Sequence, residues 1–441
     1  MASTYLFRAN GSGTGTTKGT ISLWFKRGVL SSAQYLHGAY IDGNNRFKIE
    51  LNSSDIVEIN NINGGSDTIV LNTNRKFRDT AAWYHLVFRV DTTQSTAADR
   101  VRLYINGVQE TSFSSSTYPS QNDTNWKTLN SGSTIDIGAY NNGGGSSAGS
   151  RTACFDGLMT HYVFTDGQSN APTVFGEVDS TSGIWKIKTA PSVTYGNNGF
   201  FLKFENSGAL GTDSSGNTNT FTLSGSGTQS IDTPSINYPS MNYLYISQSM
   251  GTLSQQNLRL AGAGGWGGRA GTIGFSKGKW YWEVQCGNSG NAHFWGIVDT
   301  SADVNQSNPQ NMTGSTVFYN GAGGEIRKDG SETSADYGTF SDTDYCGMAV
   351  DFDAGTMSIY KNGSAIVTNY AISSTKNLLL PIFMPYDDAM KVNFGTGSNG
   401  AFTVSSNSGN GYSDGNSQGI FQYAPPTGYY AINSKNLNTY G

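Results

Sequence analysis

Charged side chains are scarce in this chain of 441 residues, because Asp, Glu, Lys and Arg together make up only 13% of it. An average soluble domain contains about 25%. A helical bundle needs Glu, Lys and Arg on its exposed faces, so the scarcity argues against a mainly helical protein. The net charge is −5, which leaves no excess of basic side chains to neutralise phosphates. Nucleic acid is therefore not expected as a partner.

Cysteine and long apolar runs are also rare. Cys154, Cys286 and Cys346 lie far apart and show no metal-ligand spacing. We expect buried, reduced thiols, although a Cys286–Cys346 pair stays open. No apolar run reaches 18 residues, and the first residues lack the apolar core and cleavage site of a signal peptide. The sequence therefore predicts folding in a reducing cytoplasm without membrane insertion.

Glycine and aromatic residues are abundant, with 57 Gly, 24 Tyr, 22 Phe and 8 Trp. Segments such as 20–26, 83–90 and 101–105 alternate between apolar and polar residues, which predicts strands. Asn106-Gly107 and Asn362-Gly363 stand between such segments and predict hairpins, because both turn residues need positive φ. Strand follows strand without helical crossovers. The fold class predicted is therefore all-β, with two antiparallel sandwiches in tandem.

Two series of predicted strands divide the chain. The first occupies residues 1–205 and the second residues 241–441. Residues 206–240 are rich in Gly, Ser and Asn, which predicts an ordered but irregular connector. A Gly-rich insertion at 397–419 interrupts the second series near its end.

The second series resembles the SPRY domain. The motifs that carry the resemblance, in the family's order, are Gly278-Lys-Trp-Tyr-Trp-Glu-Val, Trp295-Gly-Ile, Asp344-Tyr-Cys-Gly-Met-Ala-Val-Asp-Phe-Asp, Met357-Ser-Ile-Tyr-Lys-Asn-Gly, Leu380-Pro-Ile-Phe, Val392-Asn-Phe-Gly and Pro425-Pro-Thr-Gly-Tyr. The resemblance implies a jelly-roll sandwich that binds protein partners through its loops and is not an enzyme.

The first series is similar to concanavalin A-like domains of the laminin G or pentraxin type. The segments that carry this similarity are Ser22-Leu-Trp-Phe-Lys-Arg, Trp83-Tyr-His-Leu-Val-Phe-Arg-Val-Asp, Val101-Arg-Leu-Tyr-Ile-Asn-Gly and Phe155-Asp-Gly-Leu-Met. The run from Phe164-Thr-Asp-Gly-Gln to Asp232-Thr-Pro resembles structural proteins of marine and cyanobacterial tailed phages, which fuse a lectin-like domain to a SPRY domain. This resemblance implies a virion component that folds in the host cytoplasm before assembly.

Catalysis is not expected. The laminarinase type of this fold carries Glu-x-Asp-x-x-Glu on one strand, but here Glu177-Val-Asp179 is followed by Ser182 in place of the third acid. No nucleophile elbow, zinc-protease motif or P-loop is present. No cofactor is expected either. Asp42 and Asp123 lie in oxygen-rich segments that would suit calcium, but Asp42-Gly43 is also a plain turn signal.

A polar stretch in the first domain contains a tryptophan with no strand pattern around it. Sugar rings stack on aromatic faces, and amide or carboxylate groups bind their hydroxyls. The candidate glycan-binding residues are Tyr118, Asn122, Asp123, Asn125, Trp126 and Tyr140. The alternative is that Trp126 packs under its own loop or against a neighbouring subunit.

The second domain offers candidates for a protein interface. Trp266 lies among glycines and is followed by Arg269, and Trp and Arg are enriched at interfaces. Tyr319, Tyr337 and Tyr386 are the loop aromatics expected on the SPRY binding face. A simple loop-packing role is the alternative for Trp266.

These observations predict a phage tail or fibre adhesin that binds host surface polysaccharide. The alternative is a capsid decoration or head-appendage protein that docks to other virion proteins. Neither heptads nor a repeated shaft is visible, so a folded domain must do the docking. Virion assembly also predicts a symmetric homo-oligomer, for which a trimer is plausible.

Overall fold

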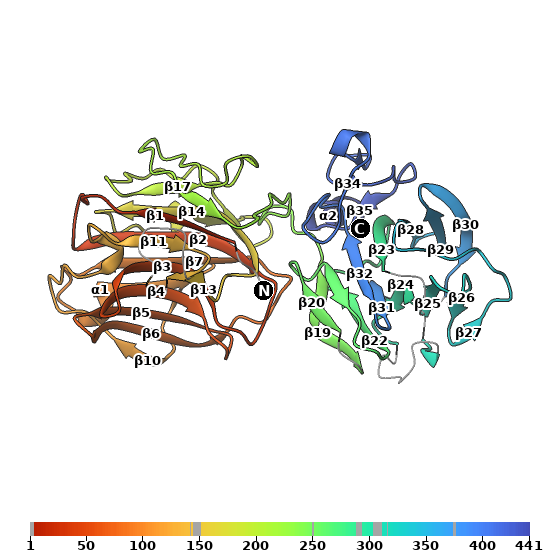
Figure 1. Ribbon diagram of the computed structural model, residues 1–441, viewed down its shortest axis with the longest axis horizontal. Helices are drawn as coiled ribbons and strands as arrows, with labels where there is room; N and C mark the ends of the chain where they lie inside the picture. Colours follow the sequence, from red (N-terminus) through yellow and green to blue (C-terminus); the bar gives the residue numbers. More distant parts are fainter. Residues whose placement is uncertain are drawn as a thin grey trace. The chain divides into compact units, whose positions relative to one another are not determined.

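The computed structural model describes residues 4–141, 143, 151–248, 251–287, 293–302, 311–314, 316–373 and 376–441. It divides into two compact units, Met1–Gln229 and Ser230–Gly441. Figure 1 colours unit 1 from red to green and unit 2 from green to blue. Both units are built almost entirely of antiparallel strands, as the sequence predicts. Among the described residues, no helix is long and apolar enough to cross a membrane.

Unit 1 is a sandwich of two large sheets. The eight-stranded sheet has the order β10 (Phe113–Thr117), β6 (Ser66–Lys76), β5 (Ile56–Asn63), β4 (Asn45–Leu51), β3 (Gln34–Asp42), β11 (Thr134–Ile137), β1 (Tyr5–Ala9) and β18 (Thr222–Ser224). The six-stranded sheet has the order β17 (Phe200–Leu202), β14 (Gly157–Asp166), β2 (Lys18–Arg27), β7 (Tyr84–Asp91), β8 (Val101–Ile105) and β9 (Val108–Glu110).

Short elements of unit 1 lie between these strands. They are α1 (Ala97–Arg100), η1 (Lys127–Leu129), η2 (Pro172–Val174) and two small hairpins, β12 (Tyr140–Asn141) with β13 (Arg151–Thr152) and β15 (Gly176–Val178) with β16 (Trp185–Ile187). The predicted Asn106-Gly107 turn joins β8 to β9, with φ of 50° and 79°. This confirms the hairpin, because both residues occupy the left-handed region.

Alternating residues of both sheets form the core of unit 1. Phe47 and Ile49 on β4 meet Leu86 and Phe88 on β7 in one buried cluster. Residues of opposite pleat face away from this cluster, so Lys48 and Glu50 lie on the outer face of the eight-stranded sheet. The sandwich therefore presents one outer face from each sheet.

Unit 2 is a second sandwich. The seven-stranded sheet has the order β19 (Met241–Gln248), β22 (Gly267–Gly271), β31 (Leu379–Pro385), β24 (His293–Asp299), β25 (Thr316–Asn320), β26 (Ile326–Lys328) and β27 (Ser331–Glu332). The other sheet runs through β20 (Thr252–Ser254), β21 (Arg259–Ala261), β32 (Ala389–Asn393), β23 (Lys279–Cys286), β28 (Cys346–Asp351), β29 (Thr356–Lys361) and β30 (Ser364–Ala371), and β35 (Tyr430–Ala431) pairs with β23 in parallel.

The remaining elements of unit 2 come late in the chain. They are η4 (Asn407–Gly409), the hairpin of β33 (Tyr412–Ser413) with β34 (Ile420–Phe421), and α2 (Ser434–Tyr440). Trp280, Trp282 and Trp295 are fully buried in the core cluster, as their strand positions predict. Cys286 and Cys346 are both buried and free, so they do not form a disulfide.

The boundary between the units falls inside the segment 206–240 that the sequence predicts as a connector. Its first half packs on unit 1, since β18 pairs with β1 and Phe221 joins the core. Its second half belongs to unit 2, where Tyr238 is buried beside Phe421 in a small cluster. Most of the segment is therefore folded onto one sandwich or the other.

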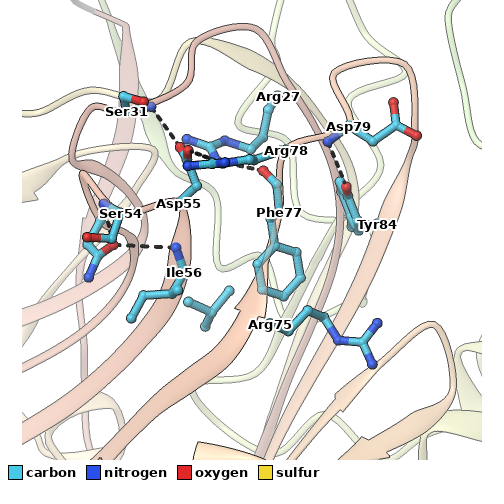
Figure 2. Close-up of polar contacts among 12 residues, drawn as sticks. Arg27, Ser31, Ser54, Asp55, Ile56, Arg75, Phe77, Arg78, Asp79 and Tyr84 are labelled. Atoms are coloured by element: carbon cyan, nitrogen blue, oxygen red, sulfur yellow. Dashed lines mark hydrogen bonds and ion pairs between the residues drawn. The ribbon is translucent and has the colours of Figure 1, made fainter. Parts of the chain in front are cut away.

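A buried carboxylate fastens one end of the unit 1 sandwich. Figure 2 shows Arg27, from the end of β2, and Arg78, from the loop after β6, converging on Asp55. Arg27 Nη1 lies 3.0 Å from Asp55 Oδ1, and Arg78 Nε lies 3.0 Å from Oδ2. The Ser31 N–H also donates to Oδ1, at 2.7 Å. Burial raises the pKa of Asp55, but these donors outweigh burial and the net pKa is lowered. Asp55 therefore stays ionised and joins three chain segments.

In unit 2 a buried glutamate likewise joins separate chain segments. Glu283 on β23 accepts the N–H groups of Gln422 and Tyr423, each at 2.8 Å, and Asn393 Nδ2 at 3.2 Å. It thereby ties the strand to the chain that follows the Gly-rich insertion. Burial raises the pKa of Glu283 to about 7, against the lowering effect of these donors.

We expect Asp55→Asn to lower the free energy of unfolding of unit 1 by about 3–5 kcal/mol, because Arg27 would be left buried without its counter-ion. Urea unfolding followed by tryptophan fluorescence measures this loss. Asp99→Asn is the matched control, because its ion pair with Arg102 is partly exposed, with side-chain exposures of 39% and 30%, and ion pairs at the surface contribute about 1 kcal/mol or less. Equal losses in the two variants would contradict the role given to Asp55.

We expect the stability of unit 2 to fall as the pH rises from about 4.3, the ordinary glutamate pKa, towards 7. The folded-state pKa of Glu283 is raised to about 7, so its contribution is complete below the unfolded pKa and is lost as pH rises through the folded value. Urea midpoints measured from pH 4 to 8 test this. The Glu283→Gln side chain cannot titrate, so this variant should show a smaller fall of the urea midpoint with pH. If the midpoint falls with pH as steeply as in the wild type, Glu283 is not the group responsible.

Candidate binding surfaces of the two units

Trp126 lies inside the core of unit 1 and not in an open loop. Its side chain is 3% exposed. Its ring makes edge contacts with Phe47, Phe88 and Phe164, with centroids 5.6–6.0 Å apart. This corrects the expectation that Trp126 stacks on a sugar and supports the packing alternative. The physical reason is that the chain turns inward before η1 and closes the gap between the two sheets.

The polar neighbours of Trp126 hold this inward turn in place. Asp123 Oδ1 accepts the N–H of Asn125 at 2.7 Å, and Thr92 Oγ1 donates to the Asp123 carbonyl at 2.7 Å. Asn122 is exposed, with a φ of 62°, and its N–H donates to the Thr92 carbonyl. Tyr118 is half-buried against the core. These contacts place Asp123 and Asn125 in loop structure, and the structure does not bring Tyr140 to them.

Tyr140 instead lies on the outer face of the eight-stranded sheet. It stacks on Tyr35 from β3, with ring centroids 4.7 Å apart and planes 22° apart, and both rings are half-exposed. Lys48 Nζ lies 6.0 Å from the centre of the Tyr35 ring. The same ammonium group binds Glu50 at 2.8 Å and Glu58 at 2.7 Å. We call Tyr35, Lys48, Glu50, Glu58 and Tyr140 the tyrosine patch.

The electrostatics of the tyrosine patch follow from two carboxylates around one ammonium group. Burial lowers the pKa of Lys48, but Glu50 and Glu58 outweigh burial and the net pKa is raised. Burial and then Glu50 raise the pKa of the Tyr35 hydroxyl. Lys48 is therefore charged and Tyr35 neutral at physiological pH. The patch combines half-buried aromatic rings with hydrogen-bonding groups, which is the chemistry expected around Trp126.

Local sequence patterns point to only one member of the tyrosine patch. Tyr140 precedes an Asn-rich stretch, which makes it a candidate glycan-binding residue from sequence alone. The other four members occupy ordinary strand positions on β3, β4 and β5. The pairing of β3 with β4 places Tyr35 opposite Glu50, and the pairing of β4 with β5 places Glu50 opposite Glu58. Only the sheet register brings these side chains together.

A serine and a histidine lie in contact on the outer face of the six-stranded sheet, but their geometry does not suit nucleophilic catalysis. Ser22 Oγ lies 2.8 Å from His85 Nε2. Trp185 Nε1 donates to His85 Nδ1 at 2.9 Å, so Nδ1 is the acceptor and Nε2 carries the proton. His85 therefore donates to Ser22 and cannot take its proton. Burial lowers the pKa of His85 to about 3, which keeps the ring neutral.

The two carboxylates that partly match the laminarinase pattern, Glu177 and Asp179, lie on the hairpin of β15 and β16. Glu177 Oε1 and Asp179 Oδ2 each lie 3.3 Å from Lys186 Nζ. Asp179 also accepts the N–H groups of Thr181 and Ser182, which lower its pKa to about 2. Both carboxylates thus stabilise a turn.

Asp42 likewise forms a turn. Its Oδ1 accepts the Asn44 N–H at 2.8 Å, and Asn45 Nδ2 binds both carboxylate oxygens. Within the described ranges, no group of three His, Cys, Asp or Glu side chains is arranged to hold a metal ion.

Unit 2 brings two of the five predicted interface residues together. Trp266 and Tyr386 make an edge contact at 4.9 Å, and both are half-buried. The N–H of Gly264 donates to the Tyr386 carbonyl at 3.0 Å, which fixes the glycine loop against the end of β31. Trp266 also packs on Phe294, with ring centroids 5.2 Å apart. Trp266 and Tyr386 thus form a partly exposed aromatic pair.

The structure places the other three interface candidates differently. Arg269 is buried, and its Nη1 donates to the Tyr243 carbonyl at 2.8 Å. Tyr319 is fully buried in the core and donates to the Gly338 carbonyl. Tyr337 is half-buried against the same core. This corrects the expectation for Arg269 and Tyr319. Both residues lie on strands of the seven-stranded sheet, β22 and β25, and their side chains are buried there instead of standing on exposed loops.

Comparison with protein families identifies both units. Residues 2–174 match the concanavalin A-like lectin/glucanases superfamily, in its laminin G form, and residues 279–397 match the SPRY domain. The chain therefore holds these two domains in tandem. No curated protein sequence gives a significant match.

Three solved structures similar to parts of the chain are two SPRY domains and a pentraxin. The SPRY domain of human HERC1 is 19% identical, and the match covers 31% of this chain and 87% of that one, with a TM-score of 0.28. A native heptameric SAP-like pentraxin from Limulus polyphemus is 12% identical, covering 36% and 68%, with a TM-score of 0.27. A human SPRY domain is 14% identical, covering 34% and 96%, with a TM-score of 0.25.

We expect Trp126→Ala to destabilise unit 1 by about 3–5 kcal/mol, because it would leave a cavity among Phe47, Phe88 and Phe164. Thermal or urea unfolding measures the loss. Trp185→Phe, which keeps a large ring at a half-exposed position, is the control and should cost less. A Trp126→Ala protein as stable as the wild type would contradict the core position.

Proposed function

We propose that this chain is a structural protein of a tailed-phage particle that works by binding and without catalysis, and that its first domain holds host surface glycan on the tyrosine patch. The observation that carries the glycan proposal is the half-exposed stack of Tyr35 and Tyr140 beside Lys48, Glu50 and Glu58. The virion assignment is supported by the resemblance of the segment from Phe164 to Pro234 to phage structural proteins.

The chemistry of the tyrosine patch favours a neutral sugar. The C–H face of a pyranose stacks on a tyrosine ring, and carboxylate and ammonium groups bind its hydroxyls as charge-assisted hydrogen bonds. Two glutamates and one lysine give the patch a net charge of −1, which would repel an acidic sugar. A neutral polysaccharide of the host surface is the ligand class that fits best.

The geometry of the polar groups in unit 1 supports binding without hydrolysis. A retaining or inverting glycosidase needs two carboxyl groups facing each other across the sugar. In the tyrosine patch Glu50 and Glu58 both bind the same lysine, so neither is set up as a proton donor. His85 is held in the tautomer that cannot activate Ser22.

A second role is favoured by the aromatic pair of unit 2. Trp266 on the glycine loop and Tyr386 after β31 are half-buried and held together, which suits an anchor for a protein partner. In this role the SPRY domain would dock to other virion proteins, as a decoration or appendage protein does. Adhesion and docking are compatible, because they use different domains.

We expect Tyr140→Ala to weaken binding to host polysaccharide by about tenfold or more, because the sugar loses its stacking surface. Purified full-length protein on an array of host polysaccharides measures this. Tyr412→Ala is the matched control, since Tyr412 is an exposed tyrosine of unit 2. Both variants should unfold like the wild type, because neither ring is in a core.

Two results would contradict the glycan role: wild-type protein that binds no polysaccharide, or a Tyr140→Ala variant that binds as well as the wild type. In either case docking through Trp266 and Tyr386 would take its place. Release of reducing ends from host polysaccharide would contradict binding without catalysis. Antibody labelling of phage particles tests the virion assignment separately, because unlabelled particles would contradict it whatever the arrays show.

A further inference from the structure

One row of side chains crosses the eight-stranded sheet of unit 1, from the tyrosine patch to the edge of the sheet. Residues that pair directly across neighbouring antiparallel strands point to the same face. Tyr35 pairs with Glu50, and Glu50 pairs with Glu58. Asn72 on β6 pairs with Glu58, and Ser115 on β10 pairs with Asn72. We call Tyr35, Glu50, Glu58, Asn72 and Ser115 the cross-strand row.

The cross-strand row lies on the outer face of the sheet. The residues of opposite pleat next to it, Ile59 on β5 and Leu71 on β6, are buried in the core cluster of unit 1. The row becomes more open towards the edge of the sheet. The side chain of Glu58 is 25% exposed, Asn72 is half-buried and Ser115 is exposed. A ligand that starts on the tyrosine patch can therefore continue along the row.

The spacing of the cross-strand row suits a linear sugar. Its members come from five consecutive strands of the sheet, in the order β3, β4, β5, β6 and β10 (Figure 1). Neighbouring strands lie about 4.8 Å apart, so the row is about 19 Å long. One strand spacing is close to the length of one pyranose in an extended polysaccharide. About four sugar residues laid along the row would therefore each meet one strand of the sheet.

The chemistry of the cross-strand row favours a sugar over a protein. Beyond the stacked tyrosines the row offers carboxylate oxygens, the amide of Asn72 and the hydroxyl of Ser115, which bind the donors and acceptors of sugar hydroxyls. The charge of Glu58 is balanced by Lys48, at 2.7 Å. The row has no apolar side chain past Tyr35. A protein partner would find little apolar surface here for the buried centre of an interface.

We infer that the cross-strand row extends the glycan site, and that its ligand is a linear stretch of about four neutral sugar residues running across the strands from β3 to β10. This inference rests on the proposed glycan role of the tyrosine patch. The first sugar stacks on the tyrosines, and the following sugars meet Glu58, Asn72 and Ser115 in turn. β10 is the last strand at this edge of the sheet in the described part of the chain, so a longer polysaccharide continues past it into solvent.

Oligosaccharides of two, four and six sugar residues test this inference. They are released from neutral host surface polysaccharide by partial acid hydrolysis, and their binding to the full-length protein is measured by titration calorimetry. The affinity of the wild type should rise about tenfold from two to four sugar residues, because each added hydrogen bond strengthens binding several-fold. It should then stay level at six, because the row ends at β10.

Asn72→Ala combined with Ser115→Ala should weaken binding of the oligosaccharide of four by about tenfold and leave binding of the oligosaccharide of two unchanged, because only the longer one reaches these side chains. Ser116→Ala is the matched control. Ser116 is exposed on the same strand but pairs with the core residue Leu71, so it lies on the opposite pleat from the row. Its loss should leave the affinity for both oligosaccharides unchanged.

Three results would overturn the inference and leave the glycan role in place. They are equal affinity of the wild type for two and four sugar residues, a double variant that binds the oligosaccharide of four like the wild type, and a Ser116→Ala variant weakened as much as the double variant. A wild type that binds none of the oligosaccharides would instead contradict the glycan role, and the extended site with it. The length series uses the wild type alone, so it decides the question even where a variant fails to fold.

Discussion

Buried carboxylates that accept backbone N–H groups hold the long loops of both domains. Loops rich in Gly, Ser and Asn have few apolar side chains to bury, so hydrophobic packing alone cannot fix them. In unit 1, Asp166 accepts the N–H groups of Thr14 and Asn198, which joins two distant loops. In unit 2, Asp414 Oδ1 accepts the Gly419 N–H and its Oδ2 accepts the Ala431 N–H, so the Gly-rich insertion is tied to the last strand. Each such carboxylate anchors loop backbone through hydrogen bonds, where apolar side chains are too few to do so by packing.

The burial of these carboxylates lowers the charge on the protein surface further. Asp55, Glu283 and Asp414 are acidic residues that lie inside the protein, so the outer surface carries even less charge than the composition indicates. The surface groups that remain for recognition are aromatic rings, amides and a few compensated ion pairs. Lys48 with its two glutamates, and the hairpin of β15 and β16, are both of this kind. Recognition by such surfaces relies on shape and hydrogen bonding more than on electrostatic attraction.

Sequence patterns predicted the strands and the core of this protein better than its surface. Trp280, Trp282 and Val284 lie on one pleat of the same strand, so their shared place in the core cluster follows from the two-residue period. Trp126 has no such period, and whether it is exposed depends on where the chain crosses between the sheets. Tyr35 and Tyr140 are 105 positions apart along the chain and meet only through the packing of β12 beside β3. Local sequence patterns cannot predict a contact between residues so far apart in the chain.

The outer faces of the two sheets of unit 1 offer different chemistry. The tyrosine patch lies on the outer face of the eight-stranded sheet. The outer face of the six-stranded sheet is covered near His85 by the hairpin of β15 and β16, whose Trp185 donates to that ring. A single stacking site holds a sugar weakly, but several copies of the proposed site joined in one particle would bind a repeating polysaccharide with a much higher effective concentration. The proposed glycan role is therefore strengthened by the proposed place in a virion, because repetition of the chain raises avidity without any new contact within it.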